Sequence, residues 1–211
     1  MSELTIALPK GSLYDSSAAA LGAIGIETPA DPGRRLTMTS LDGSAKLLLL
    51  RPTDVPAYVE FGAADCGIVG KDTLWESERS VSEAVDLRFG GCRLVVAARR
   101  CDGFHEGARY PTFLRVATKF KRMATQYFSE RDIPCEIIAL HGSVELAPLV
   151  GLADVIVDLV ATGSTLREHD MVVVDEIAAS TARFVLNPVA YRSKYARLAE
   201  LCERLQRSVA S

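Results

Sequence analysis

The stretch DVIVDLVATGSTLRE, Asp154 to Glu168, is the part of the sequence around which the chain is organised. Residues 154–160 are mostly apolar and β-branched, which predicts a buried strand. Small hydroxylated residues and a glycine follow at 161–165, and the spacing of Thr165 and Glu168 is typical of a capping box that opens a helix. A strand that turns directly into a helix gathers unpaired N–H groups at the positive end of the helix dipole, so this turn predicts a phosphate site. An ordinary strand–turn–helix connection explains the same residues equally well.

Length and composition limit the class of protein. The chain has 211 residues, of which 48% are hydrophobic and 24% charged, and its net charge is −3. These values are typical of a soluble globular protein with one large or two small domains, and they predict no nucleic-acid or membrane partner. Five scattered cysteines without a CxxC pair argue against a disulfide framework or a zinc site, and they favour a reducing, cytoplasmic setting. Neither a signal peptide nor a membrane-spanning segment is expected.

Strands and helices are predicted to alternate along the whole chain. The predicted strands are 4–8, 36–39, 45–50, 66–69, 92–98, 115–118, 135–140, 154–160, 171–177 and 181–186, and the predicted helices are 13–24, 55–61, 73–77, 121–131 and 191–207. This alternation favours an α/β fold with mostly parallel sheets. Gly90-Gly91 predicts a crossing between two lobes, and the strand near Phe184 predicts the return. We therefore expect a discontinuous first lobe of residues 1–90 and 185–211 and a second lobe of residues 91–184.

Polar residues follow nearly every predicted strand. The first half of the chain contributes mainly cations at these positions, namely Lys10, Arg34, Arg51 and Lys71, and the second half contributes the glycine-hydroxyl turn. Ligands of open α/β sheets bind at the carboxyl ends of strands and often between lobes, so the two sets together predict a cleft for two polyphosphate substrates. Taken singly, each cation is better explained as a solvated surface residue. The sequence contains no dinucleotide fingerprint, Walker A motif or catalytic zinc pattern, and no His/Cys/Asp grouping suggests a triad.

Four segments carry a resemblance to a known family. They are LPKGSL (8–13), LLRPTDVPAYVEFGAADCGIVGKDTL (49–74), RVATKF (115–120) and GSVELAPLVGLADVIVDLVATGSTL (142–166). In this order they resemble the catalytic chain of ATP phosphoribosyltransferase. The resemblance implies a two-lobed fold similar to type II periplasmic binding proteins. It also implies condensation of ATP with phosphoribosyl pyrophosphate, with Mg²⁺, to give phosphoribosyl-ATP and pyrophosphate in the first step of histidine biosynthesis.

The resemblance also implies roles for individual residues. The implied phosphoribosyl pyrophosphate ligands are Glu145, Asp158, Ala161, Thr162, Gly163, Ser164 and Thr165, with the turn holding the 5′-phosphate and Asp158 near the ribose hydroxyls. The implied ATP ligands are Lys10, Gly11, Arg34, Arg51, Asp65, Gly70 and Lys71, of which Lys10 and Arg51 are also the candidate catalytic residues. Magnesium is expected to bind through the substrate phosphates and Glu145. The family often has a charged residue where Ser12 stands, so no contact is assigned to that position.

The length of the chain is similar to that of the short form of the family, which lacks a C-terminal regulatory domain. Short forms need a separate regulatory subunit related to histidyl-tRNA synthetase, so the resemblance implies a homodimer within a hetero-oligomer. Two alternatives stay open. One is a non-catalytic small-molecule-binding module of the same fold, which the missing signal peptide and missing helix-turn-helix extension disfavour. The other is a phosphoribosyltransferase with a different base acceptor.

Overall fold

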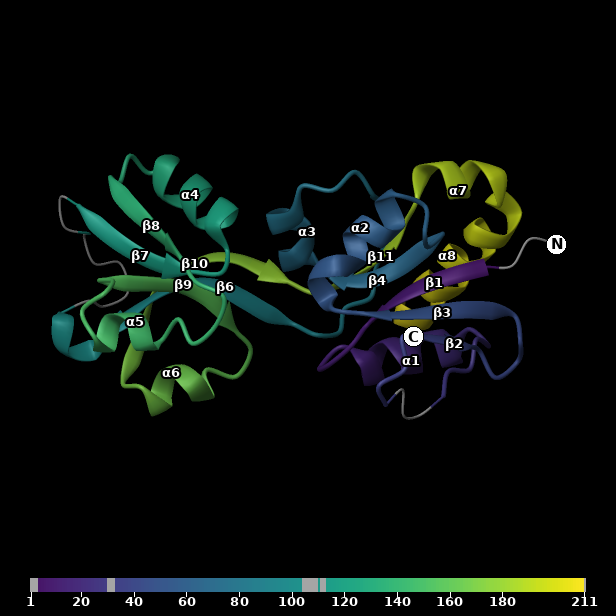
Figure 1. Ribbon diagram of the computed structural model, residues 1–211, viewed down its shortest axis with the longest axis horizontal. Helices are drawn as coiled ribbons and strands as arrows, with labels where there is room; N and C mark the ends of the chain where they lie inside the picture. The colour runs from purple at the N-terminus through teal and green to yellow at the C-terminus, as the bar shows by residue number, and fades with distance from the viewer. Residues whose placement is uncertain (1–3, 30–32, 104–109, 111–112, 211) are drawn as a thin grey trace. The chain divides into compact units, whose positions relative to one another are not determined.

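The computed structural model describes residues 4–29, 33–103, 110 and 113–210 (Figure 1). The chain divides into two compact units. Unit 1 comprises Met1–Gly90 and Thr181–Ser211, and unit 2 comprises Gly91–Ser180. The chain therefore passes from one unit to the other twice, after Gly90 and after Ser180.

Unit 1 is built on a six-stranded sheet in the order β2-β3-β1-β4-β11-β5. The strands are β1 (Leu4–Pro9), β2 (Thr37–Thr39), β3 (Ala45–Leu50), β4 (Cys66–Gly70), β5 (Ser82–Asp86) and β11 (Ala182–Leu186). The helices are α1 (Tyr14–Ala23), η1 (Pro52–Asp54), α2 (Val55–Glu60), α3 (Lys71–Ser77), α7 (Pro188–Ser193) and α8 (Tyr195–Ala210). The central strand β1 pairs in parallel with β3 and β4, and the other pairings of the sheet are antiparallel.

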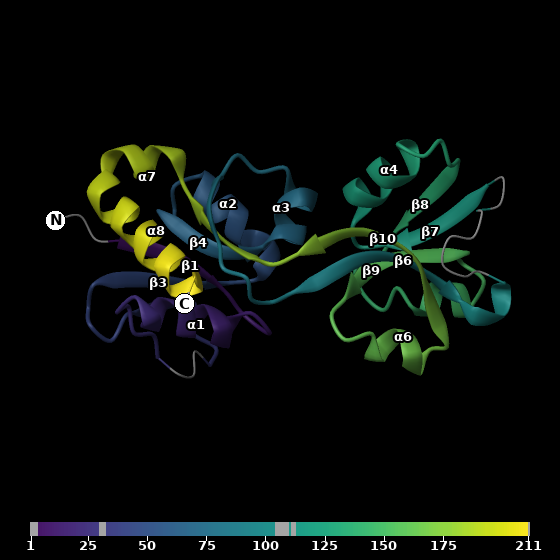
Figure 2. The same cartoon turned by 180° about the vertical axis from the view of Figure 1, so that it is seen from behind.

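Helices cover both faces of the unit 1 sheet because successive residues of a strand point to opposite faces. Ile6 and Leu8 belong to a core that includes residues of α1 and α8. Ala7, between them, belongs to a second core with Val55 and Val59 of α2. Figure 2 shows α8 running across the sheet on the side of α1. The apolar run 4–8 is buried on both faces for this reason.

Unit 2 has a five-stranded sheet in the order β10-β6-β9-β7-β8. Its strands are β6 (Cys92–Arg99), β7 (Leu114–Thr118), β8 (Cys135–Ala139), β9 (Val155–Val160) and β10 (Met171–Ser180), and its helices are η2 (Arg100–Asp102), α4 (Lys121–Ser129), α5 (Leu146–Leu149) and α6 (Ser164–Glu168). Tyr127 and Phe128 of α4 pack into the core of one face. Ala147 of α5 and Leu166 of α6 pack into the core of the other face, and Figure 1 shows these helices on opposite sides of the sheet.

The α/β class is confirmed, but the prediction of mostly parallel sheets is wrong. Four of the nine strand pairings among the described residues are parallel, and five are antiparallel. The antiparallel pairings include every one made by β6, β10 and β11, the strands that adjoin the two crossings. When the chain returns to a unit, the returning strand runs antiparallel to its neighbours in that sheet. The alternation of helices and strands along the sequence does not reveal this change of direction.

The return to unit 1 also differs from the prediction. Strand β10 continues to Ser180 through a predicted break, and two register shifts keep it paired with β6. Residues 182–184 pair with β4 and β5 and so belong to the sheet of unit 1, whereas the sequence placed them in the second lobe. A bulge accommodates extra residues without ending a strand, so polar or small residues at 178–180 do not mark its end.

Candidate active site

A cavity of about 240 Å³ lies at the carboxyl end of β9 in unit 2. Its walls come from Val95 and Ala97 of β6, from Glu145 and Ile156, and from the continuous segment 158–166. All seven residues predicted to bind phosphoribosyl pyrophosphate therefore line one cavity. The wall combines an apolar strand surface with hydroxyl, carboxylate and backbone groups, which is the composition of a small-molecule site.

The turn at 161–165 has the geometry of an anion-binding loop. Gly163 adopts φ +74°, a left-handed conformation that favours glycine, and α6 begins immediately after it. The hydroxyl oxygens of Thr162 and Ser164 lie 3.1 Å apart, and both residues are exposed. The first amide groups of a helix have no acceptor within it. The Ser164 N–H donates to Thr162 Oγ1 at 3.4 Å, so the turn offers a phosphate its other N–H groups and one hydroxyl hydrogen.

The predicted capping box at Thr165 and Glu168 is wrong. Helix α6 starts at Ser164 with Gly163 at the N-cap position, and no side chain caps it. Thr165 thus lies inside the helix. The left-handed glycine starts the helix one residue before Thr165, and the Thr162 hydroxyl accepts from the Ser164 N–H at 3.4 Å.

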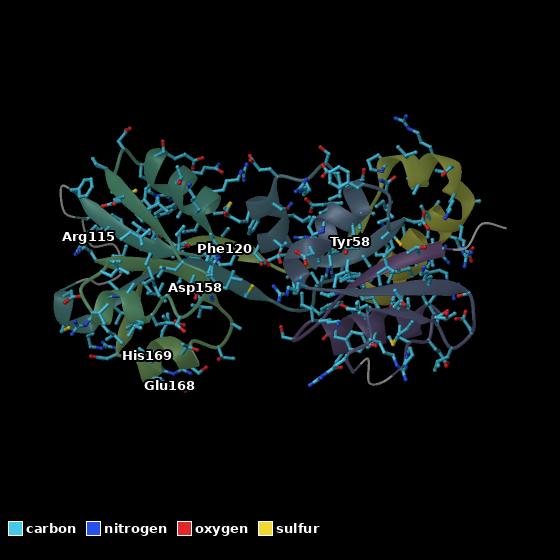
Figure 3. The ribbon with its side chains drawn as sticks, viewed as in Figure 1. Tyr58, Arg115, Phe120, Asp158, Glu168 and His169 are labelled. Atoms are coloured by element: carbon cyan, nitrogen blue, oxygen red, sulfur yellow. The ribbon has the colours of Figure 1, made fainter. Side chains whose placement is uncertain are left out.

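Asp158 is the carboxylate nearest the turn in sequence among the lining residues (Figure 3). Its side chain is 15% exposed, and its Oδ1 accepts a hydrogen bond from the Leu159 N–H at 2.9 Å. The ammonium of Lys119 lies 3.9 Å from Oδ2. Burial raises the pKa of Asp158, and the nearby charge of Glu145 acts in the same direction, whereas the Leu159 N–H and Lys119 oppose the rise. A carboxylate at this place can accept hydrogen bonds from hydroxyl groups of a ligand.

Sequence reasoning assigned no role to two cations that contact this site. Arg167 reaches back from α6 and donates from Nη1 to the carbonyl oxygen of Thr162 at 3.0 Å. A Cβ added at Gly163 would lie 3.1 Å from the same Nη1, so the guanidinium occupies the space that a larger side chain would need. Lys119 follows β7. Its position at a strand end was the available signal, because strand ends are where open α/β sheets bind ligands.

The cations predicted in the first half of the chain gather at one edge of the unit 1 sheet. Pro9 pairs with Leu50 in the parallel register, so the next residues, Lys10 and Arg51, adjoin at the carboxyl ends of β1 and β3. The Lys10 N–H also donates to the Leu50 carbonyl at 2.7 Å.

Arg34 and Lys71 belong to the same edge. The Leu36 carbonyl accepts from Leu49 N–H at 2.9 Å, which places the segment containing Arg34 beside the end of β3. Lys71 follows the end of β4, which pairs in parallel with β1. Its ammonium bonds to Glu83 and lies 5.7 Å from the centre of the Trp75 ring.

The two predicted glycines of unit 1 lie at turns of this edge. Gly11 has φ +82° and is exposed directly after Lys10. Gly70 is the N-cap residue of α3, and a Cβ there would lie 2.3 Å from Oδ1 of Asp72. The space beside Gly11 is open, whereas the Asp72 carboxylate fills the space beside Gly70.

Asp65 does not join the other residues of the predicted ATP set. It precedes β4, and its N–H donates to the carbonyl of Thr5 near the start of β1, so it lies at the amino-terminal edge of the sheet. Its Oδ2 accepts from the Thr5 N–H and from the Lys194 ammonium, both at 2.8 Å, and the residue is 9% exposed. The structure therefore gives Asp65 an anchoring role and separates it from Lys10 and Arg51.

The described residues offer neither a metal cluster nor a membrane span. They contain no cluster of three or more His, Cys, Asp or Glu side chains arranged to hold a metal ion. None of their helices is long and apolar enough to cross a membrane.

Comparison with known proteins identifies the family. The family model for ATP phosphoribosyltransferase matches residues 51–207. This chain belongs to the ATP phosphoribosyltransferase family. An ATP phosphoribosyltransferase from Moorella thermoacetica is 52% identical to it over 211 residues, a match that covers 97% of this chain and 92% of that protein. The predicted family, the glycosyltransferase class and the place at the first step of histidine biosynthesis are confirmed, which sets aside the non-catalytic binding module.

Solved structures give the same result for the fold. The ATP phosphoribosyl transferase (HisG:HisZ) complex from Thermotoga maritima contains a chain that is 35% identical to this member of the family, with a TM-score of 0.82 and 98% coverage of both chains. A substrate-binding protein of an amino acid ABC transporter matches with a TM-score of 0.61 at 13% identity, over 99% of this chain and 92% of that one. The second likeness shows the fold alone, and it confirms the predicted periplasmic-binding-protein-like architecture.

Proposed function

We propose that this ATP phosphoribosyltransferase binds phosphoribosyl pyrophosphate in the unit 2 cavity and the phosphates of ATP at the cation edge of unit 1. The observation that carries the proposal is the cavity itself, in which a glycine-and-hydroxyl turn and two carboxylates share one wall. The cation edge consists of Lys10, Arg34, Arg51 and Lys71, with the backbone of Gly11 and Gly70. Asp65 is not included, because it lies at the other end of the strands.

The turn from Ala161 to Thr165 suits the 5′-phosphate of the sugar. A phosphate monoester needs several donors that converge on one point, and the start of a helix after a left-handed glycine provides them. The exposed hydroxyls of Thr162 and Ser164 bond to each other, which leaves one hydroxyl hydrogen as a further donor. Asp158, four residues before Thr162, then lies where it can accept hydrogen bonds from the ribose hydroxyls.

The reaction requires alignment and charge stabilisation more than acid–base chemistry. Pyrophosphate leaves C1 of the ribose while positive charge develops on the sugar, and N1 of adenine attacks from the opposite face with its own lone pair. Positioning of the two reactants lowers the barrier, and fixed cations stabilise the departing pyrophosphate. Lys10 and Arg51 are the candidate catalytic residues for that purpose, which explains why the chain needs no nucleophile or triad.

Magnesium fits the donor set of the cavity. Glu145 and Asp158 both line it, and carboxylate oxygen is the kind of ligand that Mg²⁺ takes, usually with one or two carboxylates and the substrate phosphates. We assign the ion to Glu145 and the phosphates of phosphoribosyl pyrophosphate. When bound, it neutralises negative charge on the pyrophosphate group.

A regulatory subunit related to histidyl-tRNA synthetase is the proposed partner, in a hetero-oligomer that contains a homodimer of this chain. The support is the likeness of the chain to one chain of a solved HisG:HisZ complex. The free state of all five cysteines in the structure supports a cytoplasmic setting.

A turnover assay of the purified chain tests the proposed function. The full mixture contains ATP, phosphoribosyl pyrophosphate and Mg²⁺, with and without the partner, and controls omit one substrate or replace ATP by GTP, UTP or free adenine. We expect phosphoribosyl-ATP and pyrophosphate in equal amounts only when both natural substrates are present. Equal turnover with free adenine would indicate a different base acceptor, and no product with the partner present would contradict the proposal.

A further inference from the structure

We propose that Lys119 is a further substrate-binding residue of this site and that it contacts the pyrophosphate group of phosphoribosyl pyrophosphate from within unit 2. This inference rests on the proposed function of the unit 2 cavity. It adds to the cation edge of unit 1 a cation that lies beside the sugar site.

The sheet register places Lys119 next to Asp158. Strands β7 and β9 are parallel, and Thr118 pairs with Val157. The next residues along the two strands are Lys119 and Asp158, and their charged groups lie 3.9 Å apart between Nζ and Oδ2. Neighbouring residues in register point to the same face of a sheet, so Lys119 points toward the side of the sheet that Asp158 occupies.

The backbone on both sides of Lys119 is fixed. The buried hydroxyl of Thr118 donates to the Val157 carbonyl at 2.7 Å and accepts from the Phe120 N–H at 2.8 Å. One hydroxyl thus ties β7 to β9 and holds the turn that contains Lys119. A cation on a fixed backbone loses less conformational entropy on binding a ligand than one on a free loop.

The acidic lining of the cavity requires a nearby cation if an anionic substrate is to bind there. Two acids, Asp158 and Glu145, line the cavity, and none of its described lining residues is a lysine or an arginine. Arg167 contacts the turn at Thr162, so Lys119 is the cation on the side of Asp158. An anionic substrate that enters between two carboxylates is repelled unless a positive charge lies close by. Lys119 is the charged partner of Asp158, and its side chain is 40% exposed, so it can also reach a ligand.

The Lys119 ammonium retains donors for a ligand. Its distance of 3.9 Å from Asp158 is longer than a direct hydrogen bond, so the pair is held by charge and not by a shared proton. An ammonium group has three N–H donors. Among the described residues, the Lys119 ammonium makes this one ion pair and no hydrogen bond.

The chemistry of the sugar indicates which group Lys119 contacts. Asp158 is assigned to the ribose hydroxyls at C2 and C3, so the anionic groups left for the cation beside it are the 5′-phosphate and the pyrophosphate on C1. The 5′-phosphate is at the other end of the sugar, in the turn at 161–165. Lys119 therefore lies near the pyrophosphate on C1.

Binding measurements with three ligands test this assignment. Calorimetry of the full chain with phosphoribosyl pyrophosphate, inorganic pyrophosphate and ribose 5-phosphate compares Lys119→Ala with wild type. We expect about 10-fold weaker binding of the two ligands that carry pyrophosphate, the usual effect of losing a hydrogen bond from a charged group, and a change of less than about 2-fold for ribose 5-phosphate. Lys119→Arg should recover most of the affinity. Lys46→Ala, with the same change of charge at the amino end of β3, should bind all three ligands normally.

The three ligands also separate this inference from the proposed function. If Lys119→Ala weakens the binding of ribose 5-phosphate as much as the binding of phosphoribosyl pyrophosphate, Lys119 acts only by positioning Asp158, and the inference is wrong. Unchanged binding of all three ligands overturns it as well. A Gly163→Val chain that binds ribose 5-phosphate normally would instead contradict the phosphate turn, whatever the result at Lys119.

Discussion

Lys10 and Arg51 adjoin at the ends of two paired strands, so each contributes a cation at nearly the same place. Lys10→Ala and Arg51→Ala should each lower kcat by about 30-fold to 1000-fold, equivalent to about 2–4 kcal/mol of transition-state stabilisation. Steady-state kinetics with both substrates measures this, and circular dichroism checks the fold. Wild-type kinetics in both variants would remove their assigned catalytic role. Lys46→Ala, at the other end of β3, is the matched control.

Asp154 and Arg115 form a contact that stabilises unit 2. The carboxylate accepts from the Arg115 N–H and Nη2 at 2.8 Å each, and the hydrogen bond from the Arg115 side chain lowers the pKa of Asp154 below its ordinary 3.8. Because the folded chain has the lower pKa, the stabilisation is complete above 3.8 and is lost as the pH falls below it.

The resulting prediction concerns Asp154→Asn. Both side chains are partly exposed, so we expect the substitution to lower the free energy of unfolding by only about 1 kcal/mol at pH 7. Urea unfolding of the variant and wild type from pH 7 to pH 3 measures the difference. The difference in free energy of unfolding between wild type and variant should become smaller below pH 3.8. A difference that becomes larger there would contradict the assignment.

At single residues, the sequence predicted the site best where the chemistry is local. The glycine and hydroxyls at 161–165 predict the turn directly, and all five of these residues line the cavity. Lys119 was missed because its partner lies across the sheet, in a register that no local pattern reveals. Asp65 was assigned to ATP by the family resemblance alone, whereas it lies at the amino end of β4, away from Lys10 and Arg51.

Asn187 joins two elements of unit 1. Its carbonyl oxygen accepts from the N–H groups of Val189 and Ala190 at the start of α7, at 2.9 and 2.7 Å. Its amide donates to the carbonyl oxygens of Val59 and Glu60 at the end of α2, at 2.8 and 3.0 Å. The residue is 4% exposed, so water cannot replace these partners.

Two substitutions at Asn187 separate its functions. Asn187→Ala removes the cap and both bonds to α2, and it should lower the free energy of unfolding by about 2–4 kcal/mol. Asn187→Ser keeps an oxygen that can cap the helix and loses the amide donors without burying a charge, so a smaller loss is expected. Chemical unfolding of both variants measures the difference. Equal losses would show that the cap contributes nothing.

At the scale of elements, apolar runs were predicted well and polar strands were not. Strand β9 lies within one residue of its predicted bounds because its burial makes it apolar at every residue except Asp158. Strand β5 was missed, since it is a sheet edge with Val85 as its one buried residue. The single predicted helix 191–207 is two helices, and the first begins earlier because Asn187 caps it at Pro188.

For the whole molecule, the family and fold class followed from the order of several motifs, whereas the direction of the returning strands did not. Strand direction depends on pairings between segments far apart in sequence, such as β11 with β4.

The proposed partner gives a prediction for the assembled enzyme. Feedback inhibition by histidine should reside on the regulatory subunit, so turnover by this chain alone should be insensitive to histidine. Addition of the partner should confer inhibition, measured as pyrophosphate release over a histidine titration. Inhibition of the isolated chain would place the histidine site on this chain and contradict the assignment.

The central claim is that the turn around Gly163 holds the 5′-phosphate of phosphoribosyl pyrophosphate. The most direct test is calorimetric binding of each substrate to Gly163→Val and to the milder Gly163→Ala, after confirmation that both variants fold. A side chain at φ +74° strains the turn and displaces Arg167. We predict that binding of phosphoribosyl pyrophosphate weakens at least about 10-fold while ATP binding changes less than about 2-fold. Equal loss of both substrates, or no loss of either, would contradict the account.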